Sequence, residues 1–183
     1  RSLDYAEITF KKFADELEAN LEAGIYAFKG AEKTRVTWEG IAVWPYLGHT
    51  FKSLKSLGSI MTGSAYPGLW DLHYDAHDDS LHSMAEAYTR IYINTCLENK
   101  VNVLLNIVNG GKCDGIVYHL NRSCKLMSFL NVETAEIIKE KTGLPYVSFD
   151  GDQTDPRNFA PAQFDTRVQA LAEMMEANLA AAE

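Results

Sequence analysis

One short segment of this 183-residue chain combines a thiol with cationic side chains. Residues 119–125 read HLNRSCK, so Cys124 has Arg122 and Lys125 close on either side. Positive charge favours the thiolate form of a cysteine, and a thiolate is what both a nucleophile and a soft metal ligand require. A partly buried structural cysteine is an equally open interpretation of the same position. A cysteine nucleophile would also need a positioned base. His119 is near in sequence, but the strand sets the direction of its side chain, not Cys124.

The other two cysteines are predicted to be structural. Cys96 falls in the first turn of a predicted helix, and Cys113 precedes the strand that ends before Cys124. Three widely spaced cysteines without a C-x-x-C pair indicate no disulfide framework, which favours a reducing cytoplasm. Because Cys113 and Cys124 are expected at opposite edges of a sheet, a metal site at Cys124 would need ligands from elsewhere.

Two further segments carry groups of polar residues that suggest metal binding. Residues 150–157 read DGDQTDPR, which resembles part of a calcium loop, but Pro161 stands where the twelfth-position glutamate would be. His73, His77 and His82 lie near several aspartates in an irregular, Gly- and Pro-containing stretch. We interpret the first segment as a turn that leads into a helix and the second as a solvated loop.

Apolar periodicity predicts the elements that position these segments. Phe10, Phe13, Leu17 and Leu21 follow helical spacing, and Gly24 is a plausible helix end. Short apolar runs predict strands, and amphipathic runs predict helices between them. The predicted strands are 35–38, 59–63, 114–119 and 144–149, and the predicted helices are 4–23, 48–57, 81–92, 95–108, 133–142 and one that opens at Pro161.

Alternation of strands and helices predicts an α/β fold with a parallel sheet covered on both faces. The carboxyl ends of parallel strands meet at one edge, and ligands bind beyond that edge. The loops 39–47, 64–80, 119–125 and 150–157 should therefore converge. On this geometry Glu39, Trp44 and His119 lie near a pocket. Trp38, Trp44, Trp70 and Tyr46 are expected in the core or in the pocket walls.

Composition excludes several functional classes. A net charge of −8 lacks the basic clusters of a nucleic-acid-binding protein, and no apolar run reaches the length of about 18 residues that a membrane span needs. The first five residues are not a signal peptide, since no apolar stretch follows them. Dinucleotide-binding, P-loop and serine-hydrolase motifs are missing from the sequence.

Four segments together resemble the 2-hydroxyacyl-CoA dehydratase family, which includes the benzoyl-CoA reductases. They are residues 114–125 (DGIVYHLNRSCK), 149–159 (FDGDQTDPRNF), 35–40 (RVTWEG) and 44–47 (WPYL). The resemblance implies a flavodoxin-like, three-layer domain with a four-stranded parallel sheet and an N-terminal helix. Residues 1–183 would form one such domain at the C-terminal end of a longer subunit, with the helix in residues 1–30 and the α/β core in residues 31–183.

The resemblance also implies a chemistry. Cys124 would be one ligand of a [4Fe–4S] cluster whose other cysteines lie in an N-terminal portion that is absent here. An ATP-dependent iron–sulfur activator would supply one electron, and water would leave a 2-hydroxyacyl-CoA through a ketyl radical anion. A second dehydratase subunit would complete the enzyme. Glu39, His119 and Ser123 are then candidate catalytic residues, and Trp44 and Arg122 are candidate substrate-binding residues.

This fragment alone is expected to hold no stable cluster, to be inactive and to show a free Cys124 thiol on an exposed loop. Three alternatives remain open at this point. The chain could belong to an aromatic ring reductase of the benzoyl-CoA type, to a cluster-free flavodoxin-like binding domain, or to a thiol enzyme that uses Cys124 as its nucleophile.

Overall fold

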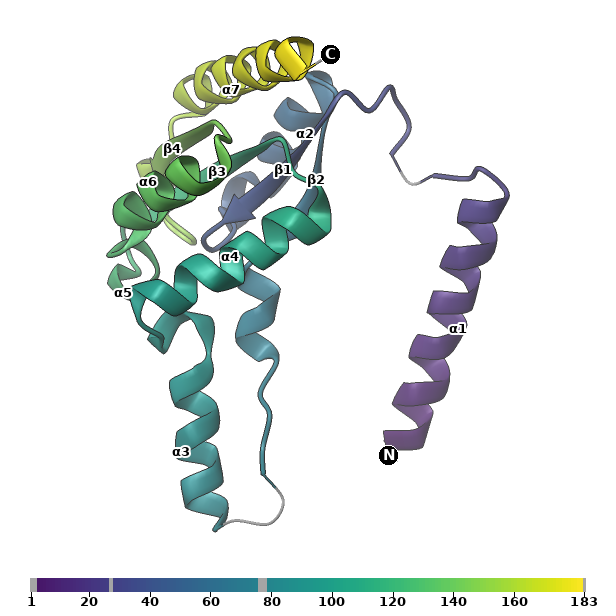
Figure 1. Ribbon diagram of the computed structural model, residues 1–183, viewed down its shortest axis with the longest axis vertical. Helices are drawn as coiled ribbons and strands as arrows, with labels where there is room; N and C mark the ends of the chain where they lie inside the picture. Colours follow the sequence, from purple (N-terminus) through teal and green to yellow (C-terminus); the bar gives the residue numbers. More distant parts are fainter. Residues whose placement is uncertain (1–2, 27, 76–78, 183) are drawn as a thin grey trace. The chain divides into compact units, whose positions relative to one another are not determined.

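A computed structural model describes residues 3–26, 28–75 and 79–182 (Figure 1). The chain divides into two compact units, residues 1–31 and residues 32–183. The first unit contains one long helix, α1 (Leu3–Glu22), as its apolar spacing predicts. Gly24 follows the helix with a φ of +70°, which is the left-handed conformation expected at a helix end. Phe10, Phe13 and Leu17 are exposed on α1.

The second unit is built on a four-stranded, all-parallel sheet, as predicted. The strand order is β2-β1-β3-β4, so the chain starts near the middle of the sheet and winds to both edges. The strands are β1 (Thr34–Glu39), β2 (Ser59–Ser64), β3 (Gly115–Asn121) and β4 (Tyr146–Gly151). Each connection is a crossover through helices, which brings all four carboxyl ends to one edge.

Helices cover both faces of this sheet, which gives the predicted three layers (Figure 1). The α-helices are α2 (Leu47–Ser56), α3 (Ser80–Arg90), α4 (Leu97–Gly111), α5 (Lys125–Ser128), α6 (Asn131–Thr142) and α7 (Pro161–Ala182). Short 3₁₀ turns are η1 (Trp44–Tyr46), η2 (Tyr66–Trp70), η3 (Tyr92–Asn94) and η4 (Pro156–Asn158). Helices α2 and α7 pack on one face, and α4 and α6 pack on the other.

Alternation along the strands sends neighbouring side chains to opposite layers. Trp38 and Val117 join the α2–α7 layer, whereas Ile116 and Tyr118 join the α4–α6 layer. Gly115 lets α7 approach the sheet closely, because a Cβ there would lie 2.7 Å from the Met175 sulfur. Two buried clusters, one on each face, thus hold the sheet and fix the edge at which its loops meet.

Two local predictions were wrong. The helix predicted from residue 95 begins two residues later, since α4 starts at Leu97 and the Cys96 side chain before it makes no capping bond. The Thr95 hydroxyl accepts a hydrogen bond from the Asn99 side chain at 2.9 Å. Strand β3 also continues two residues beyond the predicted end, so His119 lies within a strand instead of opening a loop.

Among residues 3–26, 28–75 and 79–182, no helix combines the length and the apolar character that crossing a membrane requires.

Candidate functional site

The loops after the four strands meet at the carboxyl edge of the sheet, as the topology predicts. The Trp44 backbone N–H donates to the Gln153 carbonyl at 3.3 Å. The Asn121 side chain at the end of β3 donates to the Gln153 side chain at 3.1 Å. The Tyr66 ring, which follows β2, packs edge-on against Trp44 with 6.2 Å between the ring centres. These contacts join the loops that follow β1, β2, β3 and β4.

Cys124 lies at this edge, immediately before α5. Its backbone N–H donates to the Asn121 carbonyl at 3.2 Å, which holds it in a tight turn after β3. The residue is half-buried and packs against a small apolar cluster that includes Tyr92 and Met127, against which Tyr66 also packs. The loop around it is exposed at Arg122, Ser123 and Lys125, as expected, whereas the free cysteine itself is only partly exposed.

The other cysteines occupy different parts of the unit, as predicted. Cys113 is buried at the amino end of β3, and its sulfur lies 2.9 Å from the Thr37 hydroxyl. Cys96 is exposed at the start of α4. In the part of the chain that the structure describes, no three His, Cys, Asp or Glu side chains are grouped as metal ligands. Cys124 is thus a single thiol at the carboxyl edge.

The segment before Cys124 is bound to the loop after β4. The Ser123 hydroxyl donates to the Asp152 carboxylate, and two backbone N–H groups, those of Thr154 and Asp155, donate to its other oxygen at 2.8 and 2.9 Å. These hydrogen bonds, that of Ser123 first, hold the pKa of Asp152 well below its usual range. The Asp152 carboxylate therefore organises a turn, as predicted, and fixes the side chain next to Cys124.

Arg122 remains available at the surface. Its guanidinium lies 3.5 Å from the Asp150 carboxylate, and both side chains are more than half exposed. Such an exposed pair contributes little to stability, so Arg122 can turn toward an anionic or carbonyl ligand without a large loss.

Behind Cys124 lies a buried group of polar side chains. Glu39 is fully buried, and one of its carboxylate oxygens accepts a hydrogen bond from the Tyr92 hydroxyl at 2.8 Å. Burial raises the pKa of Glu39 to about 7, although Tyr92, Lys100 and the Gly40 backbone act in the opposite direction. Glu39 is consequently able to exchange a proton near neutral pH.

Lys100 completes this group from α4. It is 2% exposed, its ammonium lies 5.1 Å from the centre of the Tyr92 ring, and it donates to the Leu126 carbonyl at 3.3 Å. Burial lowers the pKa of Lys100, whereas electrostatic interactions with the Glu39 and Cys124 side chains act in the opposite direction. The Lys100 side chain thereby connects α4 with the turn of helix that begins after Cys124.

His119 is also fully buried, inside β3. Its Nδ1 donates to the Ile41 carbonyl, and its ring stacks on Phe149 with 5.0 Å between ring centres. Burial lowers the pKa of His119 despite this hydrogen bond, so the imidazole is neutral at neutral pH. A Cβ on Gly151 would come within 2.6 Å of its Nε2. Through its hydrogen bond to the Ile41 carbonyl, His119 therefore helps to hold the loop after β1 in place.

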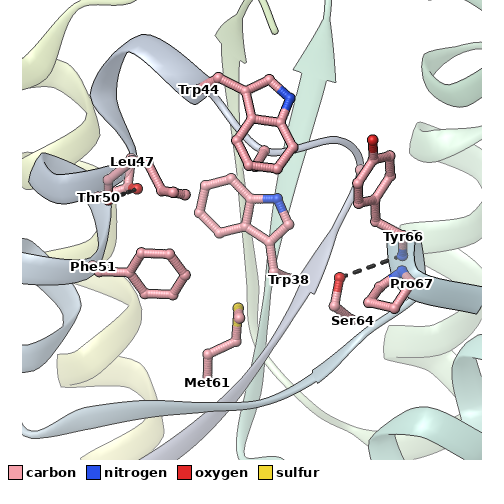
Figure 2. Close-up of a pocket in the computed structure, with 11 residues that line it drawn as sticks. Trp38, Trp44, Leu47, Thr50, Phe51, Met61, Ser64, Tyr66 and Pro67 are labelled. Atoms are coloured by element: carbon pink, nitrogen blue, oxygen red, sulfur yellow. Dashed lines mark hydrogen bonds between the residues drawn. The ribbon is translucent and has the colours of Figure 1, made fainter. Parts of the chain in front are cut away.

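An apolar cavity of about 240 Å³ opens on the opposite face of the sheet from Glu39 (Figure 2). Its floor is Trp38. Leu47 and Phe51 of α2 lie on one side of that ring, and Tyr66 lies on the other (Figure 2). Trp44, which is 50% exposed, stands at the rim. The loop turns at Gly40, whose φ of +103° and contact with the His119 backbone leave no room for a side chain.

The cavity contains only part of the predicted pocket residues. Trp44 lines it. His119 does not line it, but its ring centre lies 6.3 Å from that of Trp38, which does. Glu39 does not line it, since alternation along β1 points Glu39 to the sheet face opposite Trp38. Tyr46 packs on Phe159 in the core as predicted, whereas Trp70 is 73% exposed, so its assignment to a core or wall was wrong.

The histidine-rich stretch shows no metal geometry where it is described. His73 pairs with Asp71 at 3.2 Å on the surface, and His82 is exposed on α3. The prediction that concerns His77 lies outside the described residues. A solvated loop, the favoured interpretation, is consistent with these positions.

Comparison with known proteins now identifies the family. Residues 3–175 match the family described as 2-hydroxyglutaryl-CoA dehydratase, D-component. The chain belongs to this family. It is 84% identical over its whole length to the lactoyl-CoA dehydratase subunit alpha of Anaerotignum propionicum, and 48% identical over 91% of its length to the (R)-2-hydroxyisocaproyl-CoA dehydratase alpha subunit of Clostridioides difficile. A benzoyl-CoA reductase subunit from Thauera aromatica is more distant, at 27% identity over 79% of the chain.

Membership of the dehydratase family confirms the resemblance on which the sequence interpretation depended. The chain covers 43%, 40% and 34% of those three relatives, so it spans less than half the length of each.

Two residues of this candidate site were missed by sequence reasoning. Tyr92 gave no signal, because its contact with Glu39 joins positions 53 residues apart. Lys100 did give one: it stands on the same helical stripe as Val101, Leu104 and Val108, all of which are buried. A lysine on the apolar face of a helix indicates a buried cation that needs polar partners.

Proposed function

We propose that this chain is the Cys124-bearing portion of an iron–sulfur subunit that removes water from a 2-hydroxyacyl-CoA. The observation that carries the proposal is the position of Cys124, the cysteine found at the carboxyl edge of the sheet, in a chain whose residues 3–175 match a dehydratase family. The relatives named as lactoyl-CoA and 2-hydroxyisocaproyl-CoA dehydratase subunits support the substrate class.

The surroundings of Cys124 fit one ligand of a [4Fe–4S] cluster. The residue is partly buried beside an apolar cluster, which limits access of water, and a thiolate sulfur is the usual protein ligand of such clusters. The described residues offer one cysteine at this edge, so the remaining ligands would come from beyond this chain. When bound, such a cluster supplies a path for one electron to the thioester of the substrate.

The side chains would then bind, orient and hold protons. Removing water from the acyl group takes the hydroxyl from C2 and one proton from C3, and the electron that started the reaction is returned at its end. Arg122 and Trp44 would orient the thioester, because both are exposed beside Cys124 and the cavity. Glu39 would hold a proton near neutral pH, and Ser123 and His119 would fix the loops around the substrate.

The proposal requires partners that this chain does not contain. A second dehydratase subunit would complete the active site, and an ATP-dependent iron–sulfur activator would deliver the electron. Because the cluster and its radical chemistry are sensitive to oxygen, the enzyme would act in the cytoplasm of an anaerobic cell.

Replacing Cys124 with serine in the longer protein, made without oxygen, tests the proposal. Iron content and the electron paramagnetic resonance signal of the reduced protein are expected to fall strongly. Cys96→Ser is the matched control, since Cys96 is exposed just before α4 and should keep full iron. Wild-type iron in Cys124→Ser would reject the cluster assignment. Turnover of an aromatic acyl-CoA in place of a 2-hydroxyacyl-CoA would favour a ring reductase.

A further inference from the structure

The cavity above Trp38 has walls that offer burial and almost no hydrogen bonds. None of its lining residues is charged. The Thr50 hydroxyl already donates to the Leu47 carbonyl at 3.0 Å, and the Ser64 hydroxyl accepts from the Tyr66 backbone at 3.3 Å (Figure 2). A molecule that enters this space exchanges contacts with water for contacts with carbon atoms. The favoured occupant is therefore an uncharged, apolar group.

The size of the cavity limits that group. An apolar cavity of about 150 Å³ is large enough to bind benzene. The volume of about 240 Å³ therefore has room for one ring or for a branched chain of similar bulk. It is too small to enclose a whole coenzyme A, whose nucleotide and pantetheine parts are also polar.

The position of the cavity connects it with Cys124. The cavity lies over the Trp38 face of the sheet near the carboxyl ends of β1 and β2, and Cys124 follows the carboxyl end of β3. Tyr66 lines the cavity and also packs against the same apolar cluster as Cys124, that of Ile41, Ala65, Tyr92 and Met127. A ligand whose reactive carbonyl lies at the Cys124 edge can therefore place an attached side chain against Trp38 and Phe51.

We propose that this cavity binds the uncharged side chain of the acyl group of a CoA thioester and so selects against acyl groups that end in a second carboxylate. This inference rests on the proposed function. A terminal carboxylate would lose its hydration among Trp38, Phe51 and Met61 without gaining a cation, which is strongly unfavourable. Each further methylene group of the acyl chain that becomes buried should raise the affinity about fourfold.

Titration of the longer protein, made without oxygen, with a series of CoA thioesters tests the proposal, with tryptophan fluorescence as the signal. The series consists of free CoA, acetyl-CoA, pentanoyl-CoA and glutaryl-CoA. Pentanoyl-CoA has three more methylene equivalents than acetyl-CoA, so its affinity is expected to be about 60-fold higher. Glutaryl-CoA has the same number of acyl carbons as pentanoyl-CoA but ends in a carboxylate, and it is expected to bind at least about tenfold more weakly.

Phe51→Lys places a cation in the wall and should reverse that preference. Phe51 is 43% exposed, so a lysine there can keep its charge hydrated while the fold is retained. Glutaryl-CoA should then bind more tightly than pentanoyl-CoA. Leu179→Lys adds the same charge at a 41% exposed position on α7 and should leave both affinities unchanged. Trp44→Ala, at the exposed rim, should weaken pentanoyl-CoA without affecting free CoA.

Several results would overturn the assignment. Affinity that does not depend on acyl length, binding of free CoA as tight as that of pentanoyl-CoA, or no binding of any thioester would each reject it. An unchanged preference in a folded Phe51→Lys protein, verified by circular dichroism, would do the same. None of these outcomes alters the iron content of Cys124→Ser, so the proposed dehydratase function is tested separately.

Discussion

Glu39 should make the chain less stable as the pH rises toward neutrality. The carboxyl is fully buried, and its pKa is raised from 4.5 to about 7 in the folded state. Below about pH 4.5 it is protonated in both the folded and the unfolded chain. Between about pH 4.5 and 7 the unfolded chain releases the proton while the folded chain keeps it, so the free energy of unfolding falls. At about 1.4 kcal/mol for each pH unit, the total loss is about 3 kcal/mol.

Glu39→Gln is expected to remove most of this pH dependence. The glutamine oxygen can still accept the hydrogen bond that Tyr92 donates to Glu39. The amide N–H groups would be buried where the second carboxylate oxygen has no partner among the described residues, which costs about 1–3 kcal/mol at every pH. The absolute stability of the variant is therefore less informative than the slope of its stability against pH.

Urea unfolding at pH 5, 6, 7 and 8, followed by tryptophan fluorescence and circular dichroism, measures that slope. The wild type should lose about 3 kcal/mol between pH 4.5 and 7, most of it within the measured range, and Glu39→Gln should lose little. Glu140→Gln, at an exposed position on α6, is the matched control and should follow the wild type. Parallel pH profiles for wild type and Glu39→Gln would refute the reasoning, because the proton uptake would then belong to another group.

Two further predictions concern the loop beside Cys124 and the packing of α7. Asp152 has a lowered pKa because Ser123 and backbone N–H groups bind its carboxylate, so the stability it provides is present above about pH 4 and is lost as the pH falls. Asp152→Asn should reduce the fall in the free energy of unfolding at acidic pH, measured by urea unfolding. An unchanged fall would contradict the assignment. Gly115→Ala should lower the free energy of unfolding by about 1–3 kcal/mol, because the new Cβ would lie 2.7 Å from the Met175 sulfur. Gly68→Ala, with nothing within 4 Å, is its control and should change stability far less.

The sequence alone determined the sheet and the edge at which the chemistry gathers. Apolar strands alternating with amphipathic helices leave few topologies, and right-handed crossovers bring the carboxyl ends together. For the same reason the sequence located Cys124 at that edge and Cys113 at the other, and it predicted the turn that Asp152 organises. These are local or topological properties, and each follows from a short window or from strand order.

Only the tertiary structure decided what surrounds each of those positions. Cys124 is partly buried beside an apolar cluster of Ile41, Ala65, Tyr92 and Met127, which distant segments of the chain bring together. Glu39 follows Trp38 on the same strand but faces the opposite layer, so one enters a buried polar group with Lys100 and the other forms the cavity floor. Burial, pKa and cavity shape depend on side chains that are distant in sequence, and periodicity along the chain contains no record of those contacts.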